Sequence, residues 1–177
     1  MAPRRALFWT LAAATLAVYA AMLGWSLPRL SAAASGLAPF DMRPLGYTEA
    51  EARVFLGLLG EEGARFYLGV QQRLDTAFPA LSAATLAIAI AHLARAWPAP
   101  ARYAAAAVPL LGGAFDYAEN AAVAVMLRAG ANGLTAEMVA SASRWTVLKS
   151  AFVAVAFLLV LSLLARAALA RLRGGAP

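Results

Sequence analysis

The 177-residue chain contains no cysteine and only one histidine. Without cysteine, the chain cannot form a disulfide, bind a metal through thiolates or use a thiol as a nucleophile. A single histidine excludes a cluster of histidine metal ligands and disfavours a serine–histidine triad. We therefore predict that the protein holds neither a metal ion nor a cofactor.

Charged residues are also scarce, at 14% of the chain, while hydrophobic residues make up 63%. Soluble domains contain about 25% charged and about 45–50% apolar residues, so this composition favours a lipid bilayer as the solvent. The sequence also lacks a nucleophile elbow, a P-loop, an HExxH motif and a glycine-rich dinucleotide fingerprint. An enzyme is therefore the less favoured interpretation.

Four apolar segments approach the ~20 residues needed to cross the hydrocarbon core of a bilayer. They cover residues 6–27, 78–97, 104–127 and 145–165. The first follows two arginines, as a signal peptide does, but its apolar run is longer than the ~7–15 residues of a cleaved signal. We expect an all-α integral membrane protein that forms one domain over residues 1–177, with four transmembrane helices in an antiparallel bundle.

Basic residues collect on one side of these predicted spans, where no acidic residue occurs. They are Arg4, Arg5, Arg95, Arg102, Arg166, Arg171 and Arg173. Because lysine and arginine are enriched in cytoplasmic loops, we expect a multi-pass protein of the plasma or inner membrane with both termini in the cytoplasm. This distribution accounts for most of the net charge of +6. The lipid bilayer, and not nucleic acid, is therefore the expected partner.

The connection between the first two spans, residues 28–77, is too long for a plain loop. Its residues 48–77 are expected to form one or two short amphipathic helices on the extracytoplasmic side. Thr48, with Glu51 three residues later, fits a capping box that starts the first helix, and Gly60 can end it. Three apolar residues are expected to line one face of this helix: Val54, Phe55 and Leu58.

An Asp-Tyr-Ala-Glu-Asn sequence, residues 116–120, interrupts the third apolar segment. It would lie near the centre of a bilayer, where ionisable groups are costly and mark either a site or a structural lock. Lys149 lies one turn inside the fourth segment, and Asp75 lies just before the second. From the rise of a helix, we expect Lys149 to pair with Glu119, with Asp75 as a rival partner and Asp116 harder to reach.

Five polar residues form the candidate ligand-binding site: Asp75, Asp116, Glu119, Asn120 and Lys149. In one interpretation they line a cavity, open toward the outer leaflet, that binds a cation, a proton or a polar head group. In the other, they form a buried ion-pair network that fixes the register of the helices. Two acids against one lysine leave a carboxylate unpaired, and this imbalance favours the binding site. Tyr67 and Gln71 precede Asp75 at intervals of four residues, a specific pattern that indicates no particular activity.

These observations predict a small membrane protein that binds or transports a small polar or cationic solute or protons. We expect it to assemble as a homo-oligomer or within a larger membrane complex. One alternative is an accessory or assembly subunit, in which Lys149 or Asp116 pairs with another chain. A second alternative is a lipid-processing membrane enzyme, in which Asp116 and Glu119 act as general acid and base.

Overall fold

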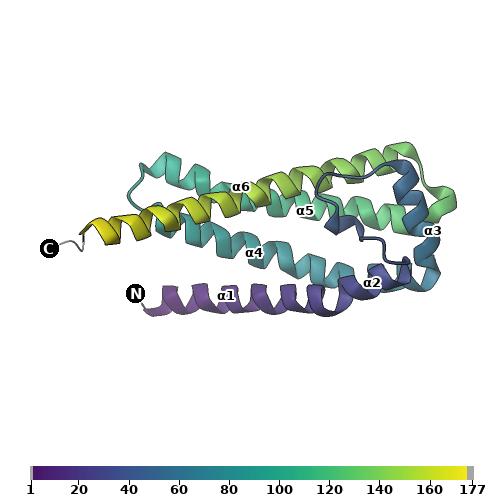
Figure 1. The fold of residues 1–177 in the computed structure, drawn as a ribbon, viewed down its shortest axis with the longest axis horizontal. Coiled ribbons are helices and arrows are strands. Elements are labelled where there is room, and N and C mark those ends of the chain that lie inside the picture. The colour runs from purple at the N-terminus through teal and green to yellow at the C-terminus, as the bar shows by residue number, and fades with distance from the viewer. Residues whose placement is uncertain (1, 175–177) are drawn as a thin grey trace.

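The computed structural model describes residues 2–174, which are mostly helical and contain no β-strand (Figure 1). The six α-helices are α1 Ala2–Ala21, α2 Leu27–Ala33, α3 Glu49–Phe66, α4 Gln72–Leu93, α5 Ala99–Gly133 and α6 Ala136–Gly174. A π-helical turn, Met22–Ser26, joins α1 to α2, and a second one, Tyr67–Gln71, joins α3 to α4. The loop between α2 and α3 contains a short 3₁₀ turn, Phe40–Met42. The predicted helical class is confirmed.

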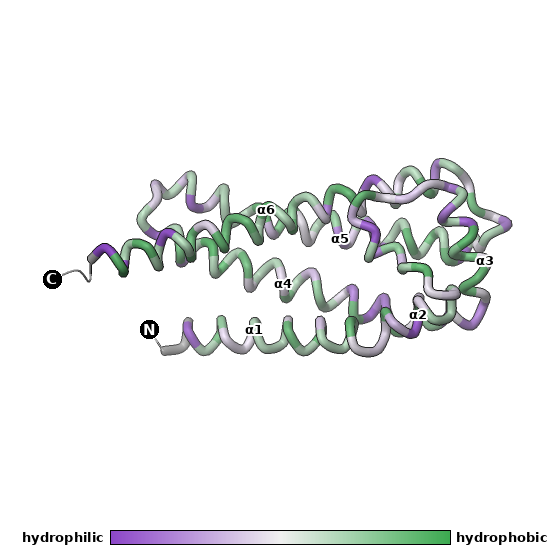
Figure 2. The backbone as a smooth tube through the Cα atoms, in the orientation of Figure 1, coloured by the Kyte–Doolittle hydropathy of each residue, from purple (hydrophilic) through white to green (hydrophobic). Residues whose placement is uncertain are grey.

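Four long helices, α1, α4, α5 and α6, extend along the length of the molecule (Figure 1). Both ends of the described chain lie at one end of the long axis, and α3 lies at the other end (Figure 1). α5 packs against both α4 and α6, and α1 packs against α4. Figure 2 shows mostly apolar residues along the middle of α1, α4 and α6, with hydrophilic residues toward the two ends.

Within residues 2–174, three helical segments are long and apolar enough to cross a membrane. They are Arg5–Ala33, Glu49–Leu93 and Ala136–Arg173. The predicted third span, which falls in α5, is not among them, because Asp116, Glu119 and Asn120 interrupt its apolar sequence. By length and composition, this chain is therefore compatible with a membrane through three of its helical segments.

A buried apolar core lies at the α3 end of the molecule, in a part that we call the head. The head consists of α2, the loop of residues 34–48, α3 and the adjoining ends of α5 and α6. Its buried core includes Leu30, Phe40, Tyr47, Phe55, Leu59, Tyr67, Val123, Met126, Leu127, Leu134 and Val139. The segment 28–77 has structure of its own, as predicted. However, the end of the predicted span 104–127 also belongs to the head, because Val123, Met126 and Leu127 are covered by its core.

The predicted capping box at the start of α3 is confirmed. The backbone N–H of Thr48 donates to Glu51 Oε2 at 2.7 Å, and the N–H of Glu51 donates to Thr48 Oγ1 at 3.3 Å. These two bonds satisfy N–H groups that a helix start leaves without partners. At Gly60 the backbone has φ of +63°, so the chain bends there before the helix continues.

The structure divides the predicted apolar face of α3 between the protein interior, where Phe55 is fully buried, and the surface. Val54 is 55% exposed and Leu58 is 46% exposed. The residues that α3 buries are Ala52, Phe55, Leu56, Leu59 and Gly63. Packing of α3 against the end of α5 selects this face, and the apolar pattern of the sequence fits either choice.

Gly113 lets α5 approach α4 closely. A Cβ atom at this position would lie 3.2 Å from Ala83 Cβ and 3.3 Å from the carbonyl oxygen of Pro79. Gly113→Ala is therefore expected to destabilise the protein by about 1–3 kcal/mol through overpacking. Chemical unfolding of the purified protein measures this difference.

Gly57→Ala on α3 is the matched control, because a Cβ there would meet no atom within 4 Å. Replacing an unhindered helical glycine with alanine is expected to stabilise the protein by up to ~1 kcal/mol. Equal effects of the two substitutions would contradict the close α4–α5 packing.

Candidate functional site

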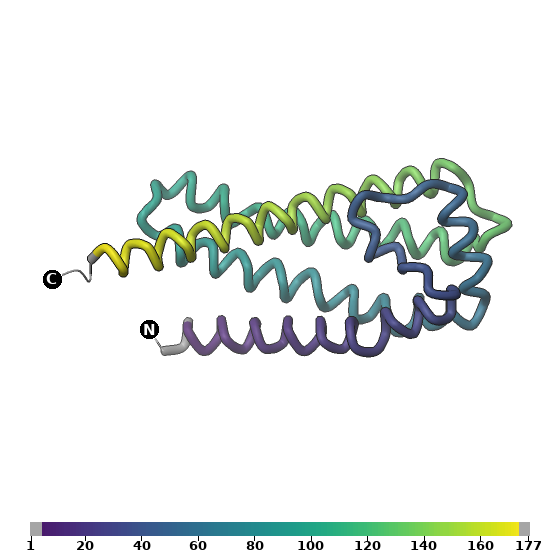
Figure 3. Tube along the Cα trace, viewed as in Figure 1, coloured from purple at the N-terminus to yellow at the C-terminus, as the bar shows by residue number. Residues whose placement is uncertain are grey.

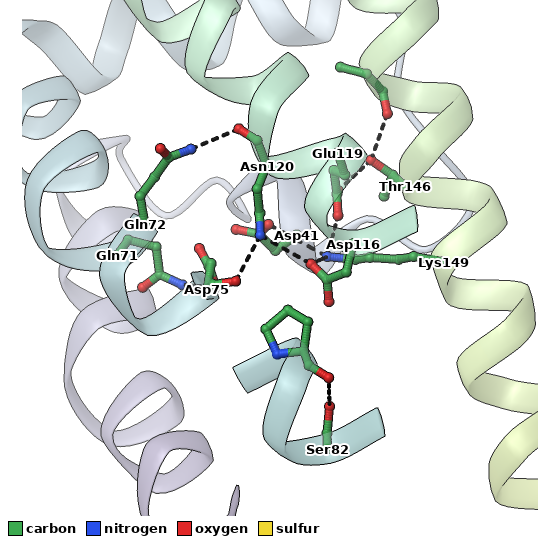
Figure 4. Close-up of polar contacts among 12 residues, drawn as sticks. Asp41, Gln71, Gln72, Asp75, Ser82, Asp116, Glu119, Asn120, Thr146 and Lys149 are labelled. Atoms are coloured by element: carbon green, nitrogen blue, oxygen red, sulfur yellow. Dashed lines mark hydrogen bonds and ion pairs between the residues drawn. The ribbon is translucent and has the colours of Figure 1, made fainter. Parts of the chain in front are cut away.

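Lys149 of α6 lies among three carboxylates that come from different parts of the chain (Figure 4). Its Nζ lies 3.4 Å from Asp116 Oδ1 and 3.6 Å from Asp41 Oδ1, and it pairs with Glu119 Oε2. The side chains are largely buried, with exposed fractions of 12% for Lys149, 13% for Asp116, 8% for Asp41 and 0% for Glu119. We call these four residues the Lys149 network.

Two hydroxyl groups add hydrogen bonds to the carboxylates of the Lys149 network. Thr146, one turn before Lys149 on α6, donates to Glu119 Oε1 at 2.5 Å. Tyr67, on the π-helical turn before α4, donates to Asp41 Oδ2 at 2.5 Å. Glu119 and Asp41 therefore each contact both Lys149 and a hydroxyl donor, an arrangement that offsets part of the cost of their burial.

Asp75 lies beside this network and is 4% exposed. Its Oδ1 accepts a hydrogen bond from Gln71 Nε2 at 3.0 Å, and its backbone carbonyl accepts one from Asn120 Nδ2 at 2.9 Å. The Asn120 amide also lies 3.3 Å from Asp116 Oδ1, so it links Asp75 to the Lys149 network. Among the described residues, Asp75 forms no ion pair.

Two buried oxygen atoms at Asp75 have no hydrogen-bond partner in the structure. They are Asp75 Oδ2 and Gln71 Oε1, and Gln71 is fully buried. A buried polar atom without a partner typically costs about 1–3 kcal/mol. The pair therefore calls for an explanation beyond packing.

The π-helical turn Tyr67–Gln71 positions two of these polar residues. A π-turn closes i→i+5 hydrogen bonds and accommodates one more residue than an α-turn. Tyr67, Gln71 and Asp75 all point into the protein, although their four-residue spacing would drift around an α-helix. The local change in helix type therefore brings all three side chains toward the same interior.

All five residues of the predicted site come together in the structure. The predicted Lys149–Glu119 pair is confirmed. Asp116 was expected to be harder to reach, but it also contacts Lys149, because its side chain points toward α6. Asp75, the predicted rival partner of Lys149, bonds to Gln71 instead.

Asp41 is the residue of the Lys149 network that the sequence analysis missed. It lies in the loop of residues 34–48, which folds back beside the α6 segment near Ser143 (Figure 3). Its one local signal is its position directly after Phe40, a fully buried side chain that holds the loop in the head core. Tyr67 and Thr146 were also missed as partners of the carboxylates.

The geometry does not suggest a metal centre. Within the described residues, no group of three or more histidine, cysteine, aspartate or glutamate side chains is arranged to bind a metal ion. Two surface hollows lie in the head, away from Lys149. One, of about 210 Å³, is lined in part by Arg29, Leu59 and Phe66, and the other, of about 490 Å³, by Arg43 and Val54.

Tyr47 lies in the head at the end of the loop that carries Asp41. Burial raises the pKa of its hydroxyl above the ordinary value of 10.0. The folded state therefore holds this proton more tightly, so stability that is fully present below pH 10 declines as the pH rises further. Between pH 9 and pH 11, the free energy of unfolding of the wild type should fall by about 1.4 kcal/mol relative to that of Tyr47→Phe.

Urea titrations of the two proteins at both pH values measure their free energies of unfolding. Subtracting the value for Tyr47→Phe from that for the wild type at each pH removes the effect of other groups that titrate in this range. A constant difference between wild type and Tyr47→Phe would show that the hydroxyl of Tyr47 titrates as in the unfolded chain.

Comparison of this chain with protein-family models, with curated proteins and with solved structures finds no match. Inference about function therefore rests on the geometry and charge of the site.

Proposed function

We propose that this chain is a multi-pass protein of the plasma or inner membrane, with four spans in an antiparallel bundle and both termini in the cytoplasm. The placement of both ends of the described chain at one end of the molecule supports an even number of crossings (Figure 1). In this proposal α5 also crosses the membrane, although its own composition does not favour insertion. Packing of both α4 and α6 against α5 supports this assignment. The arginines near the termini and in the α4–α5 turn support the cytoplasmic assignment.

In this proposed arrangement, the Lys149 network lies near the extracytoplasmic boundary of the bilayer, and the helix lengths support this position. Asp116 lies 14 residues beyond Arg102 on α5, a rise of about 21 Å. Lys149 lies 17 residues before Arg166 on α6, a rise of about 26 Å. The hydrocarbon core is about 30 Å thick. If its cytoplasmic boundary lies at these arginines, its extracytoplasmic boundary lies a few ångströms past the Lys149 network.

The buried charge imbalance is the observation that carries the functional proposal. Asp41, Asp75, Asp116 and Glu119 are four carboxylates, and Lys149 is the one cation that contacts this group in the described residues. If all ionise, three negative charges remain uncompensated, and a buried unpaired charge costs several kcal/mol. Each proton or small cation taken up from the extracytoplasmic side neutralises one of these charges and lowers this cost. The protein is thus proposed to bind, and to move across the membrane, protons or a small cationic solute.

Transport is also proposed to require more than one copy of the chain or a larger membrane complex, because four helices enclose little space. The mass of the detergent-solubilised protein tests this assembly. A strictly monomeric protein would argue against a transport role. The accessory-subunit alternative is less well supported, because Lys149 and Asp116 pair within this chain.

Purified protein in liposomes that contain a pH-sensitive dye tests the proposed function. An imposed membrane potential is expected to drive proton entry faster in wild-type liposomes than in protein-free liposomes. Asp116→Asn is expected to slow this entry at least tenfold, while Glu61→Gln, which changes a side chain that is 95% exposed, leaves it unchanged.

Native mass spectrometry of the same wild-type and Asp116→Asn proteins tests for a bound solute. A small cation present in the wild type and absent from the folded variant supports cation binding. Wild-type liposomes that match protein-free ones, together with no bound species, would show that the polar cluster only stabilises the fold.

A further inference from the structure

The four buried carboxylates are not equivalent in their surroundings. Asp41, Asp116 and Glu119 all contact Lys149, and each also lies within hydrogen-bond distance of a hydroxyl or amide donor. Asp75 contacts no cation in the described structure, and one of its two carboxylate oxygens has no partner. Asp75 is therefore the one carboxylate of this group that lacks a direct cation contact in the described residues.

The groups around Asp75 do not supply the missing cation. Those that act on it electrostatically are Asp41 from the loop, Asp116 from α5, Lys149 from α6 and Tyr67 from the π-helical turn. Lys149 already contacts three other carboxylates, and α1 brings Tyr19 near α4 one turn further along, where it stacks on Phe78. The surroundings therefore contain more negative than positive charge.

The unpartnered atoms at Asp75 identify the ligand that fits. Gln71 donates through Nε2 to Asp75 Oδ1, and this leaves two acceptors, Asp75 Oδ2 and Gln71 Oε1, without a donor. A proton that adds to Oδ2 converts the carboxylate into a neutral acid and changes this oxygen from an acceptor into a donor. The same proton removes the charge of Asp75 and adds a donor next to the Gln71 side chain, whose amide already bonds to Asp75 Oδ1 and whose buried oxygen lacks a partner.

We propose that Asp75 carries the exchangeable proton of this protein and that Gln71 is its hydrogen-bonding partner, while the Lys149 network keeps its charge. This inference rests on the proposed function, and it names both the ligand and the residue that binds it. In this proposal, Asp75 takes up a proton from the extracytoplasmic side and becomes neutral. It becomes a carboxylate again when it releases that proton. Asp41, Asp116 and Glu119 keep their contacts with Lys149 throughout.

Infrared difference spectroscopy of the protein in lipid bilayers tests the inference, because a protonated carboxyl has a C=O stretching band that a carboxylate lacks. Wild-type protein at neutral pH is expected to show one such band that shifts in heavy water and disappears at alkaline pH. Asp75→Asn should lose the band completely. Glu119→Gln, which changes an acid of the Lys149 network, should keep it.

Gln71→Leu provides a second test if Asp75→Asn does not fold. This variant keeps the carboxyl and removes its partner, so the band should remain and move to higher frequency. A band that persists in Asp75→Asn, or that is unaffected in Gln71→Leu, would overturn the inference.

The inference and the proposed function can fail separately. No protonated carboxyl in the wild type, with a cation bound in native mass spectra, would overturn the role of Asp75 and leave cation binding intact. A band assigned to Asp75, with no proton or cation movement in liposomes, would retain the protonated residue and refute transport.

Discussion

Lys149→Ala is expected to destabilise the folded protein by about 3–5 kcal/mol. The substitution leaves Asp41, Asp116 and Glu119 buried without a cation, and Glu119 is fully buried. Removing one partner from a buried ion pair costs much more than the net contribution of the pair, because the remaining charges stay in a region of low dielectric constant. Unfolding of the purified protein in mixed detergent–lipid micelles measures the difference.

A double variant separates this effect from loss of packing. Lys149→Ala combined with Glu119→Gln removes one of the stranded charges, so it should recover at least 1 kcal/mol relative to Lys149→Ala alone. Lys149→Met, which keeps most of the side-chain volume, should be nearly as unstable as Lys149→Ala. If Lys149→Met retained wild-type stability, charge compensation would not be the role of this lysine.

Phe40→Ala is expected to cost about 3–5 kcal/mol, the range for a large aromatic side chain removed from a core. Phe40 is fully buried, and its ring centroid lies 4.7 Å from that of Tyr47 and 4.8 Å from that of Phe55. The three aromatic side chains join the loop to α3 in the head core. The substitution should therefore loosen the loop as well as lower the overall stability.

Thermal unfolding measures the first effect of Phe40→Ala, and limited proteolysis of residues 34–48 measures the second. Phe157→Ala is the control, because Phe157 on α6 is 52% exposed and does not belong to the head core. It should change the stability by less than 1 kcal/mol in a lipid environment. Equal losses in the two variants would show that the head core does not hold the loop.

Local rules predict much of this structure correctly. The capping box of Thr48 and Glu51 depends on residues three apart, and the sequence shows it directly. The Lys149–Glu119 pair follows from the rise of two neighbouring helices, which is the same in any helix. These features need only the geometry of regular structure.

Other features depend on packing that no local pattern specifies. Asp41 reaches Lys149 because the loop folds back over the bundle, and the burial of Phe40 holds that path. The face that α3 buries does not follow from its sequence alone, because α3 has apolar residues on two sides and the end of α5 selects one of them. A hydropathy window also cannot separate residues covered by lipid from those covered by the head, as Val123 and Met126 show.

Asp41 belongs to the head, and its ion-pair partner Lys149 belongs to a long apolar helix. If the interior binds a proton or cation as proposed, binding there is linked to binding at the head, and thermodynamic linkage acts equally in both directions. A ligand or antibody that draws the loop away from the bundle would free Lys149 from one acid and change the affinity of the interior for positive charge. Conversely, occupancy of the interior would change how tightly such a ligand binds outside. Under the proposed orientation, the head would thus report the state of the interior to the extracytoplasmic surface.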